Sequence, residues 1–151
     1  MSLAVVCPAE ADTRALGRRL ASLLRAGDVV LLAGDLGAGK TVFASGIAEG
    51  LGVAEPVVSP SFILARRHEG LMGLVHADLY RLSSSAEVDD LDLVEAAADG
   101  VLVVEWGEAA AGSFPEDHLL VRLEADDAGA RTVTLVGRGS WRERPLEEVA
   151  G

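Results

Sequence analysis

Residues 34–41 read Gly-Asp-Leu-Gly-Ala-Gly-Lys-Thr, which matches the phosphate-binding P-loop pattern G-x-x-x-x-G-K-[ST]. The preceding residues, 29–33, form an unbroken apolar run that predicts a buried parallel strand. The following residues, 41–51, carry apolar side chains at helical spacing, and glycines at positions 50 and 52 predict the end of a helix. Strand, glycine-rich loop and helix therefore follow one another in the order that a phosphate-binding site requires.

Each residue type in this loop has a chemical role. Glycines at positions 37 and 39 allow successive backbone N–H groups to surround a phosphate, and the helix N-terminus adds a partial positive charge. Lys40 would reach the β- and γ-phosphates, and the hydroxyl of Thr41 would ligate Mg²⁺. Lys40 is also the only lysine among 13 basic residues, so the chain places its one compact ammonium in the loop. The predicted phosphate-binding residues are Asp35, Leu36, Gly37, Ala38, Gly39, Lys40 and Thr41.

Composition predicts a single cytoplasmic domain over residues 1–151. Half of the residues are hydrophobic, which suffices for one core, and the chain is too short for a second. The net charge of −11 repels polyanions, so the chain alone is a poor candidate for binding tRNA or DNA. Cys7 is the only cysteine, which excludes an internal disulfide, and we expect it in the core. Neither a signal peptide nor an apolar run of membrane-spanning length is seen, so we expect no membrane partner.

A second pattern, Val-Leu-Val-Val-Glu-Trp at residues 101–106, resembles a Walker B strand. Its apolar residues predict a buried strand, whose last carboxylate emerges at the edge of the sheet where the P-loop also lies. Glu105 is therefore predicted to hold Mg²⁺ opposite Thr41, directly or through water. The alternative is a strand that simply ends at a charged turn.

The segment after the P-loop helix contains two prolines and two serines within residues 55–64, which predicts a loop entering a strand. In P-loop proteins this position often senses the γ-phosphate as a switch loop, and an ordinary connector is the alternative. The predicted switch residues are Ser59, Pro60, Ser61 and Phe62.

Residues 62–68 and 72–78 flank Gly70 and predict a hairpin. At strand spacing His76 and Asp78 share one face, with Asp78 at the end of the strand beside Tyr80. A histidine and an aspartate so spaced are more often structural than catalytic, but their position after the switch segment favours a functional role.

The remaining patterns complete an α/β prediction: a mixed, mostly parallel sheet flanked by helices, with a C-terminal β-hairpin. A leucine-striped helix precedes the P-loop strand, with Arg14, Arg18 and Arg19 on its solvated side. The other expected elements are a strand at 3–7, an acidic helical face within 83–98, a hairpin of 119–123 with 132–136, and a short helix within 141–150.

With these blocks assembled, the chain resembles the TsaE family (formerly YjeE), small bacterial ATPases of tRNA threonylcarbamoyladenosine synthesis. The resemblance rests on residues 34–41, Ser-Pro-Ser-Phe at 59–62, His-Ala-Asp-Leu-Tyr-Arg-Leu at 76–82 and Glu-Trp at 105–106. It implies a P-loop fold, hydrolysis of ATP with Mg²⁺, and partnership with the proteins TsaD and TsaB. TsaD transfers the threonylcarbamoyl group to the adenosine beside the anticodon, and tRNA would be reached only through these partners.

The resemblance also implies roles for individual residues. Lys40, Asp78 and Glu105 match residues needed for activity, with Thr41 and Glu105 as metal ligands. Trp106 matches a residue beside the site, and His76 and Tyr80 belong to the third block. Glu10 and Arg131 resemble positions that could contact the adenine end. Two departures stand out: Ser61 replaces the usual Thr, and Arg67-His68 occupies a region where Tyr is common.

Three other classes of P-loop protein are alternatives to this interpretation. A small metabolite kinase would carry an arginine-rich lid, and the paired arginines at 66–67 and 142/144 lie in no such insert. A GTPase needs an Asn-Lys-x-Asp motif, which is impossible because the only lysine is Lys40. A nucleotide-dependent binding subunit with incidental hydrolysis stays open, and ATP turnover with and without partners would distinguish it.

Overall fold

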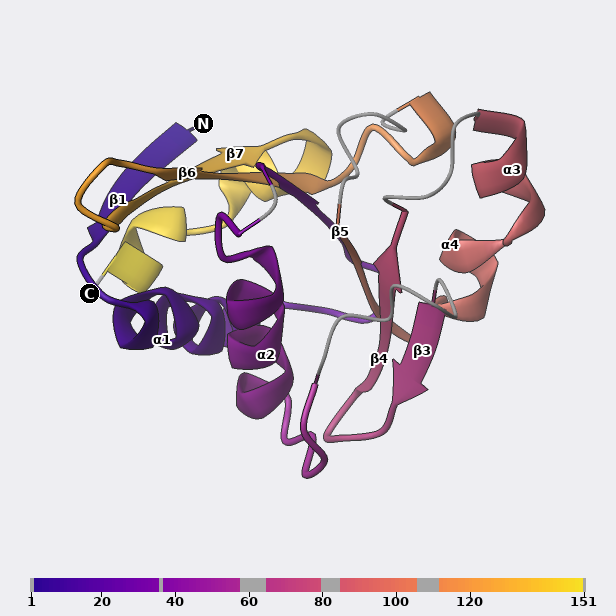
Figure 1. Ribbon diagram of the computed structural model, residues 1–151. Coiled ribbons are helices and arrows are strands. Elements are labelled where there is room, and N and C mark those ends of the chain that lie inside the picture. Colours follow the sequence, from indigo (N-terminus) through magenta and orange to yellow (C-terminus); the bar gives the residue numbers. More distant parts are fainter. Residues whose placement is uncertain (1, 36, 58–64, 80–84, 106–111, 151) are drawn as a thin grey trace.

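The computed structural model describes residues 2–35, 37–57, 65–79, 85–105 and 112–150. These residues form one seven-stranded sheet in the order β1-β7-β6-β2-β5-β4-β3 (Figure 1). Five strands, β1, β6, β2, β5 and β4, run in one direction, and β7 and β3 run against them. The predicted mixed, mostly parallel sheet is thereby confirmed. The strands are β1 Ser2–Cys7, β2 Val29–Ala33, β3 Ala65–His68, β4 Gly73–Asp78, β5 Gly100–Glu105, β6 Leu119–Ala125 and β7 Arg131–Gly137.

Strand β2 leads into the P-loop and lies in the middle of the sheet. It pairs in parallel with β5 on one side and with β6 on the other. All five of its residues are buried, because both faces of a parallel sheet are covered. Val30 and Leu32 join the core on one face, and Val29, Leu31 and Ala33 join the core on the other.

The face on the Val30 side is covered by α1 (Glu10–Leu20) and α2 (Lys40–Gly50), which lie side by side in Figure 1. The two helices approach very closely at their glycines. A Cβ atom added at Gly46 would lie 2.1 Å from the carbonyl oxygen of Arg14, and one added at Gly17 would lie 2.4 Å from that of Phe43. Glycine at these positions therefore lets the two helix backbones touch.

The arginines expected on the solvated side of α1 have partners as well. Arg14 and Arg18 form ion pairs with Glu49 of α2, at 3.0 and 3.3 Å. The Nε atom of Arg19 donates to the carbonyl oxygen of Val149, at 2.6 Å. The arginine face thus also connects α1 to its neighbours.

The opposite face is covered by α3 (Ser85–Asp90) and α4 (Leu93–Ala96). The sequence predicts one helical stretch here, and the structure has two short helices. Asp92 between them has a φ of 50°, in the left-handed region, which interrupts the helical path. Glu87, Asp89, Asp92 and Glu95 are exposed, as the charge pattern predicts.

The predicted C-terminal hairpin is present as β6 and β7, paired antiparallel. The tail forms two 3₁₀ turns, η3 (Gly139–Glu143) and η4 (Leu146–Ala150), in place of the short helix expected there; a third, η1 (Ala21–Leu23), follows α1. Arg144 pairs with Asp28 through two hydrogen bonds of 2.5 and 2.7 Å, and its guanidinium stacks on the buried ring of Trp141. The tail is thereby fastened to the start of β2.

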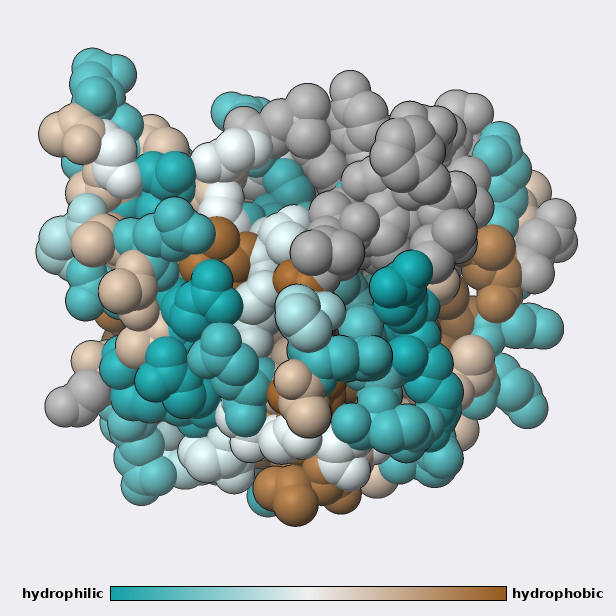
Figure 2. All heavy atoms as spheres, turned by 60° about the horizontal axis from the view of Figure 1, so that its bottom comes forward, coloured by the Kyte–Doolittle hydropathy of each residue, from teal (hydrophilic) through white to brown (hydrophobic). Residues whose placement is uncertain are grey.

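The surface in the view of Figure 2 is largely hydrophilic, with small hydrophobic areas between. Large hydrophobic side chains exposed in the described part of the chain are Val6, Leu71 and Val94. Of the helices described, none has the length and apolarity needed to cross a membrane.

Candidate phosphate-binding site

The P-loop has the backbone that the glycine pattern predicts. Gly37 and Gly39 have φ angles of 81° and 102°, in the left-handed region that favours glycine, and α2 begins directly afterwards at Lys40. Helix α1 lies close to this loop, because a Cβ on Gly39 would contact the side chain of Thr13 at 3.8 Å. The N-terminus of α2 therefore follows the carboxyl end of β2 through the glycine loop, as a phosphate site requires.

Lys40 lies folded back on its own loop. Its Nζ donates to the carbonyl oxygens of Gly34 and Asp35, at 2.6 and 2.9 Å. Burial lowers the pKa of the Lys40 ammonium, and the carboxylates of Glu105, Asp78 and Asp35 oppose this shift. The lysine is thus held inside the loop, surrounded by negative charge.

Two carboxylates lie at the ends of neighbouring strands. Asp78 ends β4 and Glu105 ends β5, and the two residues are direct partners in the parallel register. They are 6% and 3% exposed, so both are buried. The hydroxyl of Thr41 donates to Glu105, lying 3.0 Å from Oε1 and 3.2 Å from Oε2. The structure therefore brings Lys40, Thr41, Asp78 and Glu105 together, although their roles stay predictions.

His76 completes this cluster from β4. Its Nε2 lies 2.6 Å from Glu105 Oε2, in position to donate a hydrogen bond, and the ring is fully buried. The Nδ1 atom has no hydrogen-bond partner in the described ranges. The period-2 pattern placed His76 on the face of Asp78, but no sequence signal indicated Glu105 as its partner.

The two residues matched to the adenine end differ in their positions. Glu10 is exposed in the first turn of α1, and Arg131 contacts the P-loop backbone. Several predictions fall outside the described residues, namely those for Leu36, Ser59, Pro60, Ser61, Phe62, Tyr80 and Trp106.

Two contacts that the sequence did not indicate hold the segment leading to residue 58. The hydroxyl of Ser45 in α2 donates to the carbonyl oxygen of Val57, at 3.1 Å. Nδ1 of the buried His68 lies 2.5 Å from Glu55 Oε1. His68, which departs from the family pattern, therefore attaches this segment to β3.

A metal at this site would have to draw on few protein ligands. Within the ranges described, no group of three or more His, Cys, Asp or Glu side chains could hold a metal ion. Mg²⁺, however, is commonly bound by one or two carboxylates together with substrate phosphates and water. The hydroxyl of Thr41 and the carboxylate of Glu105 are hard oxygen donors already in contact, and they fit that requirement.

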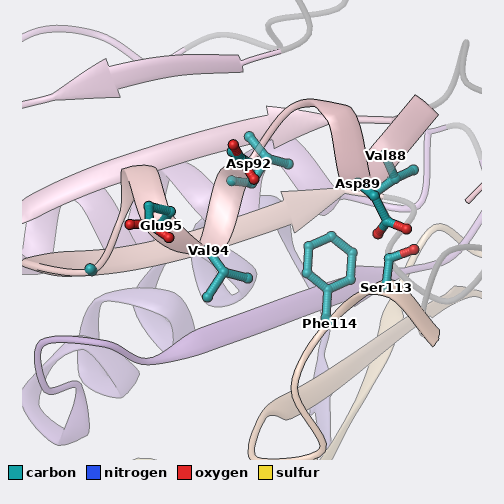
Figure 3. A pocket seen from close by; sticks show the side chains of 9 residues that line it. Val88, Asp89, Asp92, Val94, Glu95, Ser113 and Phe114 are labelled. Carbon is teal, nitrogen blue, oxygen red and sulfur yellow. The ribbon is translucent and has the colours of Figure 1, made fainter. Parts of the chain in front are cut away.

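A separate hollow of about 480 Å³ lies beside α3 and α4 (Figure 3). Asp89, Asp92 and Glu95 contribute carboxylates to its lining, and Phe114 and Val94 contribute apolar surface. None of the residues of the phosphate-binding cluster lines it. The hollow is therefore a feature distinct from the P-loop site.

A strand, a glycine loop and a helix beside a mixed sheet, with carboxylates at the neighbouring strand ends, define an α/β protein of the P-loop class. This is the predicted fold class. The family model described as threonylcarbamoyl adenosine biosynthesis protein TsaE matches residues 7–133. The chain belongs to the TsaE family.

Individual relatives agree with this assignment. A tRNA threonylcarbamoyladenosine biosynthesis protein TsaE from Streptomyces coelicolor is 48% identical over 149 residues, covering 91% of this chain and 99% of that protein. The protein of the same name from Bacillus subtilis is 36% identical, covering 92% and 88%. The crystal structure of Bacillus subtilis YdiB superposes with a TM-score of 0.80 at 32% identity, covering 99% of this chain and 95% of that one.

Proposed function

We propose that this chain binds ATP with Mg²⁺ and hydrolyses it, as the ATPase subunit of tRNA threonylcarbamoyladenosine synthesis. The observation that carries the proposal is the contact between the P-loop and the end of β5. Thr41, the last residue of the loop motif, donates to both oxygens of the buried Glu105. A hydroxyl and a carboxylate meeting beside a phosphate loop are the ligands that a nucleotide-bound Mg²⁺ uses.

The residues of the site would divide the work as follows. Lys40 would exchange the carbonyl oxygens of Gly34 and Asp35 for phosphate oxygens, which bind an ammonium more strongly because they are charged. Thr41 and Glu105 would hold Mg²⁺, which supplies positive charge against the phosphates when bound. His76 keeps the Glu105 carboxylate in place through its hydrogen bond. Asp78 would orient the attacking water or the switch segment.

The place in the pathway is supported by the names of the relatives, which are threonylcarbamoyladenosine biosynthesis proteins. The net charge of −11 favours a division of labour, because a polyanion such as tRNA is repelled by this surface. We therefore propose TsaD and TsaB as partners that handle the tRNA and the transfer reaction, while this chain supplies ATP turnover.

The deciding experiment is nucleotide binding and turnover by the purified chain and by Lys40→Ala. Removal of the only ammonium should weaken binding of an ATP analogue about a hundredfold or more, because two charged hydrogen bonds to phosphate are lost. Arg138→Ala is a suitable control, since this exposed basic residue lies at the far end of β7. Unchanged affinity in Lys40→Ala would remove the role given to this lysine.

The same titrations test the choice of nucleotide. We expect ATP to outcompete GTP at matched Mg²⁺, since the GTP-reading motif is excluded by the single lysine. A wild-type chain that binds neither nucleotide would contradict the proposed function as a whole. Preference for GTP would place the protein in another class.

A further inference from the structure

Arg131, the first residue of β7, donates to three backbone carbonyls. Its Nε lies 2.9 Å from the carbonyl oxygen of Ala38, and its Nη2 lies 3.0 Å from that of Gly37. Its Nη1 donates to the carbonyl oxygen of Gly129 in the hairpin turn. Two consecutive P-loop peptides are therefore attached to one guanidinium that lies 93 and 94 residues further along the chain.

The base of this contact is firmly held. The backbone of Arg131 pairs with Cys7 of β1 on one side and with Ala125 of β6 on the other. The preceding turn is closed by Asp126, whose Oδ1 accepts the N–H groups of Ala128 and Ala130, each at 2.9 Å. The guanidinium thus extends from a rigid support toward the P-loop, where it adds to the internal contacts that Lys40 and the N–H of Ala38 make with Gly34 and Asp35.

The restraint from Arg131 acts at the two glycines of the loop, whose backbones are the freest before the loop is ordered. Glycine loses more backbone freedom on ordering than any other residue, and Gly37 and Gly39 flank the bonded carbonyl of Ala38. In a planar trans peptide the C=O and the N–H point in opposite directions. Fixing the carbonyl of Ala38 on the arginine side therefore directs the N–H of Gly39 to the other side, where a phosphate would lie.

The charge of Arg131 is paired with no carboxylate of the described residues. Its hydrogen-bond partners among the described residues are carbonyl oxygens, and none of the ion pairs formed there includes it. A full positive charge is thus held directly behind the loop, where it favours an anion in front of it.

We propose that Arg131 is a positioning residue that presets the P-loop for phosphate before the nucleotide arrives. Its planar guanidinium holds the carbonyls of Gly37 and Ala38 on the side of the loop away from the phosphate. The loop is therefore ordered before phosphate binds, so binding does not carry the entropic cost of ordering it. This inference rests on the proposed nucleotide binding. It assigns Arg131 to the loop backbone and not to the adenine base.

The test begins without nucleotide. Amide hydrogen exchange is compared in the wild type, Arg131→Gln, Arg131→Lys and the exposed control Arg138→Gln. We expect amides at residues 37–41 to exchange at least about tenfold faster in both Arg131 variants, because a lysine cannot bridge the carbonyls as a planar fork does. Exchange in the β2 core and in the control should be unchanged. Protection of the loop equal to wild type in either Arg131 variant would overturn the proposal.

Binding measurements supply the second part. Both Arg131 variants should bind ADP, and the inorganic triphosphate ion, about tenfold more weakly than wild type, since the loss concerns phosphate alone. A loss of affinity for ADP but not for inorganic triphosphate would instead place Arg131 beside the adenine base and contradict its proposed positioning role. The exchange experiment needs no ligand, so it tests the contact between Arg131 and the loop separately from nucleotide binding. A wild type that fails to bind nucleotide would contradict the proposed function, and not this contact. Arg131→Lys keeps the positive charge and the aliphatic part of the side chain. It can therefore be used for both measurements if Arg131→Gln does not fold.

Discussion

Glu105 accepts hydrogen bonds from two elements at once. Thr41 approaches from the start of α2, and His76 approaches from β4. A buried carboxylate needs such partners, because removing a charge from water without them is strongly unfavourable. The same contacts fix the direction of its oxygens, which is what an ion ligand requires.

The two carboxylates at the strand ends should differ in their effects. Glu105→Gln loses a charged oxygen ligand and should reduce the Mg²⁺-dependent part of ATP-analogue binding by about tenfold or more. Asp78→Asn should leave binding within about threefold and lower turnover by about a hundredfold, as expected of a group that acts on the reacting atoms. Titrations with and without Mg²⁺, beside single-turnover hydrolysis, measure both effects. Hydrolysis that survives both substitutions would move the reaction to another part of the chain.

Cys7 makes stability dependent on pH in the alkaline range. Burial raises the pKa of its thiol above the ordinary value of 9.0, and the Thr13 hydroxyl opposes this in part. A raised pKa means that the unfolded state ionises first, so stability present below pH 9 is lost as pH rises toward the folded-state pKa.

Urea unfolding of wild type and Cys7→Ala between pH 8 and pH 11 measures this effect. We expect the stability advantage of the wild type over Cys7→Ala to shrink steadily above about pH 9. Lys40, whose pKa is lowered, acts in the opposite direction in the same range, but it is present in both proteins and cancels. A difference between the two proteins that is constant with pH would show that the thiol ionises equally in both states.

At the scale of elements, the pair α1 and α2 depends on the absence of side chains. The Cβ of an alanine at position 46 would approach the Arg14 carbonyl oxygen to 2.1 Å and the Arg18 nitrogen to 3.1 Å. Both are backbone atoms that cannot rotate away. The P-loop helix is therefore placed by a contact between two backbones.

Gly46→Ala should destabilise the protein by about 1–3 kcal/mol, since the helices must separate. The sign of the change in unfolding free energy is informative, because alanine within a helix is otherwise more stable than glycine by about 1 kcal/mol. Gly112→Ala is the matched control, because a Cβ at this position has no atom within 4 Å. The free energy of unfolding of this variant should stay within about 0.5 kcal/mol of the wild-type value. Urea unfolding of both variants decides the matter, and a Gly46→Ala protein as stable as wild type would refute the close contact.

Elements with local signals could be predicted from the sequence. The apolar runs of β2 and β5, the P-loop and both hairpins follow from patterns within a few residues. The break between α3 and α4 could not be predicted, because the left-handed φ of Asp92 is not dictated by its residue type. In the site, the contact between Thr41 and Glu105 could be predicted, because ligands in parallel α/β sheets bind at the carboxyl ends of the strands, where both residues lie.

Contacts between distant side chains could not be predicted. Arg144 pairs with Asp28 across 116 residues, and Arg131 reaches the P-loop across 93 or more. Each depends on how the C-terminal hairpin packs beside β2, which no short pattern encodes. The spacing of residues in β4 indicates His76 as a candidate, but its partner depends on the register of β4 against β5.

For the whole molecule, the net charge disfavours tRNA binding by this chain. With 24 acidic and 13 basic residues, the chain lacks the excess of Lys and Arg that nucleic-acid binding draws on. We expect no measurable tRNA binding by this chain alone at physiological salt, and binding to a TsaD–TsaB pair that depends on the nucleotide state. Affinity for the pair is measured with an ATP analogue, with ADP and without nucleotide, beside direct tRNA titration. Equal affinity in all three states, or tight tRNA binding, would contradict the proposed subunit role.

The order of strands has a consequence for the synthesis of the protein on the ribosome. β1 pairs with β7, and β2 lies between β5 and β6. When the first two strands leave the exit tunnel, the strands that will flank them have not yet been translated. We therefore infer that the nascent chain carries two unpaired apolar strands through most of its synthesis, and that it exposes surface of the kind that chaperones bind until its final third emerges.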